Sequence, residues 1–150
     1  MTEITFEVEG LPMPQGSHTA VSRGGKPALI PAGTSTSRKA FATWRGLVAD
    51  AAADMVPDDG PLDGPLEVSI TFRLPMPGSR NADTRRTGWA WAATKPDLDK
   101  LVRAVGDSLV AGGLIRDDSR IVRITAEKVE VGGTWCGAEI AVRPCTGDWS

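Results

Sequence analysis

The sequence predicts an α+β fold in which a mixed β-sheet packs against two main helices, in the order β-α-β-α-β-β. Two observations support this prediction: apolar residues alternate with polar ones along some segments, and they recur at helical spacing along others. Loops rich in glycine and proline separate these segments. A chain of 150 residues is long enough for one hydrophobic core, so residues 1–150 are expected to form a single domain.

Four segments are predicted to be strands because apolar and polar residues alternate along them. In chain order they cover residues 5–9, 66–74, 121–131 and 138–142. In the first of them, Ile4, Phe6 and Val8 share one side. The second has an apolar residue at every other position and is the clearest strand in the sequence. Gly132 and Gly133 are predicted to turn the third strand directly into the fourth, giving a β-hairpin.

Two segments are predicted to be helices, residues 37–55 and residues 96–111. Ser35 or Ser37 is a suitable N-cap for the first helix. The apolar stripe predicted for the first helix contains Phe41, Trp44, Leu47 or Val48, and Ala51. The stripe predicted for the second contains Leu98, Leu101, Val102, Val105 and Leu109. Each stripe is expected to face the sheet.

The remaining segments are predicted to be loops. Residues 10–16 contain two prolines, which fix φ and remove backbone donors, so this segment is expected to be extended. Residues 17–36 are rich in Gly, Pro and Ser and indicate a long basic loop or an irregular hairpin. Residues 56–65 hold three prolines and two glycines, and residues 75–94 carry three arginines and two tryptophans. Both are predicted to lack regular structure.

Charge is distributed unevenly, although the formal net charge is only −2. Residues 10–49 contain five bases and no acid, residues 50–67 contain six acids and no base, and residues 80–95 are basic again. Any one of these runs could be ordinary solvated surface charge. Together they favour a basic face that contacts nucleic acid on a chain that is acidic on average.

Composition excludes several other classes of protein. No segment has the length and apolar character of a membrane span, and the N-terminal residues lack the pattern of a secretory signal. A cytoplasmic location is therefore expected. Cys136, Cys145 and the single histidine, His18, are too few and too widely spaced for a zinc site. No glycine-rich phosphate loop is found, so no nucleotide cofactor is expected.

Two pairs of aspartates indicate metal-dependent phosphodiester chemistry. Asp97 and Asp99 begin the second predicted helix, and Asp117 and Asp118 follow its end. Mg²⁺ prefers a few carboxylate oxygens, neutralises phosphate charge and activates water. On a regular helix the first two carboxylates would lie roughly 200° apart. Because Pro96 favours a cap position for Asp97, both can face one ion, and the second pair is expected to converge on them. Either pair alone is a weak signal.

The spacing of these aspartates resembles that of the RusA-like crossover junction endodeoxyribonucleases of bacteria and their phages. The positions that fall on the family pattern are Asp97, Asp99, Leu101, Asp107, Leu109, Asp117, Asp118, Ile121 and Lys128. Residues 10–16 are similar to the family's glycine–proline entry loop. The resemblance implies a cytoplasmic homodimer, encoded by a bacterium or by a phage in a bacterial host. It would resolve four-way (Holliday) DNA junctions by paired symmetric nicks in recombination and repair, with Mg²⁺, or Mn²⁺ in its place.

The resemblance also implies roles for individual residues. The catalytic and metal-binding carboxylates are Asp97, Asp99 and Asp118, with Asp117 as a further metal ligand and with Asp107, Lys100 and Lys128 in support. Arg103 stands where the family commonly has a lysine, and Lys100 stands where it commonly has an asparagine. Arginine keeps the charge but cannot shuttle a proton, so the expected catalytic role of Arg103 is electrostatic. The basic clusters, not the resemblance, support the expectation that DNA is bound by Arg23, Lys26, Arg80, Arg85, Arg86 and Lys95.

Other interpretations stay open at this stage. A non-catalytic accessory protein would bind branched DNA whether or not Mg²⁺ is present, and a generic metal-dependent nuclease would cleave without junction specificity. A transferase that uses Asp-x-Asp would need a nucleotide cleft. A nuclease of the Pro-Asp…(Asp/Glu)-x-Lys type is disfavoured because Glu127 and Lys128 are adjacent. Trp89 and Trp91 either stack on exposed bases or pack their loop against the domain.

Overall fold

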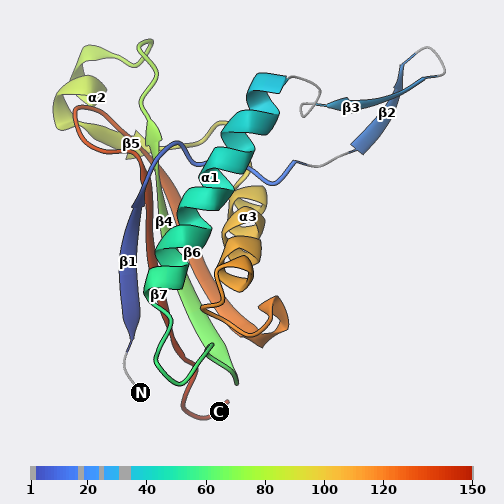
Figure 1. The fold of residues 1–150 in the computed structure, drawn as a ribbon. Helices are drawn as coiled ribbons and strands as arrows, with labels where there is room; N and C mark the ends of the chain where they lie inside the picture. The colour runs from blue at the N-terminus through green and yellow to red at the C-terminus, as the bar shows by residue number, and fades with distance from the viewer. Residues whose placement is uncertain (1–2, 17–18, 24–25, 31–34, 150) are drawn as a thin grey trace.

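The computed structural model describes residues 3–16, 19–23, 26–30 and 35–149 (Figure 1). A five-stranded mixed sheet contains, in spatial order, β1 (Ile4–Glu9), β7 (Gly137–Pro144), β4 (Leu66–Pro75), β6 (Ile121–Val131) and β5 (Trp89–Trp91). Strands β4 and β6 are parallel, and the other neighbours in this sheet are antiparallel. Two long helices, α1 (Ser35–Asp54) and α3 (Leu98–Ala111), lie against one face of the sheet (Figure 1). The predicted α+β class is confirmed.

The predicted bounds agree with the observed ones within two residues for the two long helices and for β1, β4, β6 and β7. The segment 17–36 contains a hairpin, in which β2 (Thr19–Arg23) pairs with β3 (Lys26–Ile30). The hairpin extends away from the sheet beside the start of α1 (Figure 1). Of the two conformations predicted for this segment, its described part adopts the hairpin.

The prediction that residues 75–94 are irregular is wrong in part. The segment contains a short helix, α2 (Ala82–Thr87), and the edge strand β5. The side chain of Asn81 caps α2 by accepting a hydrogen bond from the Thr84 N–H at 2.8 Å. Gly88 ends the helix in the left-handed conformation. A helix of six residues is too short to produce an apolar period, so these two capping residues were its only sequence signal.

The predicted hairpin of the last two strands is also wrong. Strand β4 lies between β6 and β7 and pairs with both of them. Gly132 and Gly133 do follow β6, but the chain then crosses the end of β4 before β7 begins. Alternation shows which side of a strand is apolar, whereas the identity of its neighbour depends on contacts distant in sequence.

The hydrophobic core lies between the sheet and the two long helices. Every second residue of β4, from Leu66 to Leu74, is buried. Helix α1 buries Trp44, Val48 and Ala52 against it, which resolves the predicted alternative of Leu47 or Val48 in favour of Val48. Helix α3 buries Leu101, Ala104, Val105, Ser108 and Leu109. None of the helices among the described residues is long and apolar enough to cross a bilayer.

Candidate active site

Asp97 and Asp99 lie together at the N-terminal end of α3. Asp97 is the N-cap residue, with extended backbone angles of φ −69° and ψ 136°, as the preceding proline predicted. Its carboxylate makes no capping hydrogen bond and is 53% exposed, and the Nζ of Lys100 lies 3.6 Å from its Oδ2. Asp99 is exposed in the first helical turn. Two carboxylates are thus accessible from solvent at one end of a helix whose N–H dipoles favour negative charge.

Lys128 fixes the turn that precedes Asp97. Its Nζ donates hydrogen bonds to the backbone oxygens of Thr94 and Pro96, at 2.5 and 2.6 Å. In the parallel register Lys128 is opposite Phe72, so its side chain extends from β6 on the side of the sheet that α3 covers. Lys128 therefore joins the sheet to the start of the helix that carries both carboxylates.

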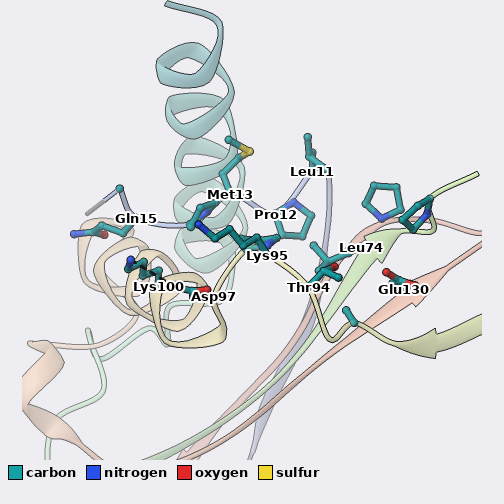
Figure 2. Close-up of a pocket in the computed structure, with 16 residues that line it drawn as sticks. Leu11, Pro12, Met13, Gln15, Leu74, Thr94, Lys95, Asp97, Lys100 and Glu130 are labelled. Carbon is teal, nitrogen blue, oxygen red and sulfur yellow. Dashed lines mark ion pairs between the residues drawn. The ribbon is translucent and has the colours of Figure 1, made fainter. Parts of the chain in front are cut away.

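A cavity of about 510 Å³ adjoins this helix end (Figure 2). Its walls come from the entry loop, the end of β4, the segment before α3 and the first turn of α3. The lining residues are Leu11–Gly16, Leu74, Pro75, Pro77, Ala92, Thr94–Asp97, Lys100 and Glu130. Figure 2 shows Met13 and Pro12 of the entry loop close to Lys95, with Asp97 and Lys100 on the neighbouring helix. The entry loop is fixed to α3 by the Gln15 N–H, which donates to the Lys100 oxygen at 3.0 Å.

Arg80, which is half-buried, forms an ion pair with the buried Glu130 at the edge of this cavity. The guanidinium donates to both carboxylate oxygens of Glu130, at 2.7 and 2.6 Å. Glu130 is only 2% exposed, and its hydrogen bonds with Arg80 lower its pKa. Arg80, which the sequence predicted to contact DNA, is therefore engaged within the protein. Sequence reasoning missed Glu130, although an acid on the core-facing side of a predicted strand was a usable signal.

Asp117 and Asp118 lie beyond the other end of α3. Asp117 caps a short 3₁₀ helix, η1 (Asp118–Arg120), by accepting a hydrogen bond from the Ser119 N–H at 3.0 Å. Its hydrogen bonding with Ser119 lowers the pKa of Asp117. Asp118 is exposed at the start of η1. Arg120 of η1 is joined to Asp63, in the loop before β4, at 2.6 Å.

One chain does not bring Asp118 to Asp97 and Asp99. Helix α3 has 14 residues between these two regions, and a regular helix of that size is about 20 Å long. Among the described residues, no three aspartate, glutamate, histidine or cysteine side chains gather as a metal site. Within one chain the two pairs therefore do not converge, because a continuous helix holds them apart.

The other predicted site residues lie on three separate elements, α3, α2 and the β2–β3 hairpin. Arg103 is exposed on α3, four residues after Asp99 and on the same side of the helix, and Asp107 is one further turn along. On α2, Arg85 is exposed and Arg86 pairs with Asp83. Arg23 and Lys26 are register partners at the turn of the β2–β3 hairpin, but their side chains, like all of His18, lie outside the described part of the structure.

Trp89 and Trp91 are 49% and 61% exposed and contact each other edge to face, with ring centroids 5.4 Å apart. Their register partners are Val131 and Val129, whereas the side chains of Lys128 and Glu130 extend to the other side of β6. The tryptophan pair therefore lies on the face of the sheet opposite the cavity. The interpretation that these rings pack the segment against the domain is disfavoured by their exposure.

Residues 9–143 match the family described as endodeoxyribonuclease RusA. A comparison with curated proteins found no match. The family match covers most of the 150-residue chain, from the end of β1 to β7, and includes both pairs of aspartates. The chain belongs to the RusA endodeoxyribonuclease family.

Proposed function

We propose that this protein is a Mg²⁺-dependent endonuclease that resolves four-way DNA junctions by paired nicks during recombination and repair. Membership of an endodeoxyribonuclease family supports hydrolysis of DNA. The observation that carries the proposal is the pair of solvent-accessible carboxylates, Asp97 and Asp99, at the start of α3. Three basic residues, Lys95, Lys100 and Arg103, surround this pair and suit a phosphate backbone.

The side chains present fit a hard divalent cation. Carboxylate oxygens are the ligands that Mg²⁺ and Mn²⁺ prefer, and the capping position of Asp97 leaves its carboxylate free of a helix-capping bond. Asp97 and Asp99 would hold the ion, which when bound supplies charge neutralisation and a more acidic water. Arg103 would stabilise the charge that develops on the phosphate, and Lys128 would keep the turn before Asp97 in place.

A second copy of the chain would supply the missing carboxylate. The edge of β6 from residue 121 to residue 127 has no partner strand among the described residues, and Val122 and Ile124 on it are 60% and 46% exposed. The unpaired backbone N–H and C=O groups of such an edge can form hydrogen bonds with a strand of another chain. In a two-fold antiparallel pair of β6 strands, the start of one strand lies beside the end of the other. Asp118 precedes the start of β6, and Lys128, which contacts the turn before Asp97, lies toward its end.

This arrangement also suits the substrate. A four-way junction presents two equivalent strands to be cut, and a two-fold dimer presents two equivalent sites. Each site would combine Asp97 and Asp99 of one chain with the partner's Asp118. Asp117 would either ligate the same ion or keep η1 in shape through its bond with Ser119.

The test compares Mg²⁺-dependent cleavage of a synthetic four-way junction with cleavage of a linear duplex of the same sequence. The wild-type protein is expected to nick only the junction, in symmetric pairs. Asp97→Asn, Asp99→Asn and Asp118→Asn are each expected to reduce cleavage roughly 10²–10³-fold or more, while junction binding persists because negative charge beside the phosphate is removed. Asp50→Asn, at an exposed aspartate of α1, is the matched control.

Two other outcomes would reject the proposal in different ways. Junction binding without cleavage, indifferent to Mg²⁺ and to Asp97→Asn, would identify a DNA-binding accessory protein. Equal cleavage of junction and duplex would identify a nuclease without junction specificity.

A further inference from the structure

The cavity beside Asp97 is more apolar than the binding of a phosphate backbone requires. Its apolar lining includes Leu11, Pro12 and Met13 of the entry loop, together with Leu74 and Ala92. Contact with such surfaces stabilises sugar and phosphate groups little, whereas the flat faces of nucleobases pack favourably against them. The volume of about 510 Å³ falls in the range of pockets that enclose small organic groups.

The position of the cavity limits what can enter it. Asp97, Lys95 and Lys100 line it on the side of α3, so a phosphate held at the start of α3 lies at its rim. The group joined to that phosphate by a single sugar is the base of the adjacent nucleotide. At the branch point of a junction this base has the weakest stacking, so moving it out of the helix costs least there.

Gln15 offers a means to recognise that base. It lines the cavity, and its backbone N–H is fixed to the first turn of α3 through the Lys100 oxygen. Its side-chain Oε1 is buried, and among the described residues it has no hydrogen-bond partner. A buried acceptor without a partner is costly, and a rotation of the side chain that turns this amide toward the cavity would let a ligand N–H satisfy it. The amide of glutamine, with one acceptor and two donors, is complementary to the edge of a base.

We propose that the cavity between the entry loop and the start of α3 receives an unstacked nucleobase from the nucleotide next to the phosphate to be cut, with Gln15 at its polar end. The inference rests on the proposed nuclease function and goes beyond it, because it assigns a binding site for one base. Insertion of the base would hold the adjoining phosphate at Asp97 and would make cleavage depend on the identity of that base.

The first experiment measures base insertion without cleavage. Junctions carry the fluorescent base 2-aminopurine on either side of the mapped cleavage position, and the protein is added in EDTA. The fluorescence is expected to rise severalfold with wild-type protein when the probe flanks that position, and to stay low when the probe lies further along the arm. Ala92→Leu, which places a larger side chain in the cavity wall, is expected to abolish the rise. Ala93→Leu makes the same change at the neighbouring exposed residue outside the cavity and is expected to keep it.

The second experiment measures cleavage in Mg²⁺. An abasic site at the inserted position is expected to slow cleavage about tenfold or more, the value of one stacked base. Gln15→Leu, which keeps the size of the side chain, is expected to reduce discrimination among the four bases there by about tenfold. Circular dichroism and thermal melting of each variant provide the check that the fold is intact.

The outcomes separate this inference from the proposed function. Absence of any Mg²⁺-dependent cleavage of junctions would reject the nuclease proposal and this inference with it. Normal junction cleavage that is indifferent to abasic sites would overturn the inference alone. Fluorescence that rises equally in Ala92→Leu and the wild type would also overturn it, and would place the unstacked base elsewhere. A cavity occupied instead by apolar side chains of a second copy predicts normal cleavage with no fluorescence change in any variant.

Discussion

Lys128 illustrates at the scale of one residue how the sheet controls the site. Its ammonium donates hydrogen bonds to two backbone oxygens, those of Thr94 and Pro96, which flank the turn leading to Asp97. An ammonium held by two carbonyls acts on the position of the carboxylate more than on DNA. Groups that orient metal ligands from outside commonly affect metal affinity or activity by 10–100-fold.

Lys128→Met is therefore expected to lower kcat by about 10–100-fold and to raise the Mg²⁺ concentration needed for half-maximal cleavage. The KM for the junction should change little, because the side chain does not face the DNA in this role. A Mg²⁺ titration of junction cleavage measures both effects. Lys128→Arg, which keeps charge and donors, should recover part of the activity, whereas Lys39→Met at an exposed lysine of α1 should leave kcat unchanged. A rise in KM alone for Lys128→Met would show that Lys128 binds DNA instead.

At this scale the sequence predicted the place of a residue in its own helix better than its contacts with residues distant in the chain. The cap position of Asp97 could be predicted because Pro96 acts on its immediate neighbours. The bonds of Lys128 join residues 34 and 32 positions apart, and the pair of Arg80 and Glu130 joins residues 50 apart. Such contacts depend on the arrangement of strands, which a residue pattern does not specify.

At the scale of elements, the close approach of α1 and α3 depends on Gly112 at the end of α3. A Cβ atom at this position would lie 2.3 Å from the backbone oxygen of Ala49 on α1. Gly106, within the same helix, has open space around it, with no such atom within 4 Å. The two glycines therefore provide a matched pair, Gly106 within α3 and Gly112 at its C-cap.

Gly112→Ala is expected to destabilise the protein by about 1–3 kcal/mol, because α3 must move away from α1. Gly106→Ala is expected to stabilise it by about 0.5–1 kcal/mol, because alanine has the higher helix propensity. Urea unfolding monitored by circular dichroism measures both changes. Equal effects of the two substitutions would contradict the proposed role of this contact.

The ion pair of Arg80 and Glu130 joins α2 and its flanking segment to β6, and it should make stability depend on pH. The hydrogen bonds from Arg80 lower the pKa of Glu130 in the folded state. A lowered carboxyl pKa adds stability above the unfolded-state pKa, and this contribution is lost as the pH falls through the folded-state pKa. Glu130→Gln is therefore expected to lower the Tm by several degrees at pH 7. The difference from the wild type should shrink as the pH falls below the ordinary glutamate value of about 4.3.

Thermal melts of the two proteins between neutral and acidic pH test this dependence. A Tm difference that stays constant as the pH falls would show that the carboxylate charge is not the source of the effect. Glu139→Gln, at an exposed glutamate of β7, serves as the control and should show little difference at any pH.

The elements themselves were predictable where one face is buried over many residues. Strand β4 begins at the predicted residue and ends within one residue of the predicted end, because every second residue from Leu66 to Leu74 is buried. The two glycines between β6 and β7 did not reveal that these strands are not neighbours. Both strands pair with β4, which lies far from them in the sequence. Helix α2 was missed because six residues at the surface, none of them buried, provide no apolar period.

At the scale of the whole molecule, the separation of the carboxylates decides how many chains make one site. Asp97 and Asp99 lie at one end of α3 and Asp118 beyond the other end, with about 20 Å of helix between them. The sequence predicted that one pair opens a helix and that the other follows its end, but not how far apart one chain keeps them, because their spacing along the chain does not determine the direction of the intervening helix in space. The proposed shared site in a two-fold dimer would reconcile the family pattern with this geometry.

Shared sites can be tested by mixing two inactive variants. In the proposed dimer, Asp97→Asn and Asp118→Asn would each remove a carboxylate from both sites of their own dimer. In a mixed dimer one site receives both substitutions, and the other combines an intact Asp97 from one chain with an intact Asp118 from its partner. Mixing the two proteins under exchange conditions is therefore expected to restore about a quarter of wild-type nicking, since half of the dimers are mixed and each has one complete site. The restored products should be single nicks, because a mixed dimer cuts only one of the two equivalent strands.

Adding Ile124→Lys to both variants should prevent the rescue by placing charge on the exposed apolar edge of β6, whereas Thr125→Lys, exposed on the opposite side of the same strand, should permit it. If each site lay within one chain, every site in the mixture would lack a carboxylate and no mixing ratio would restore cleavage.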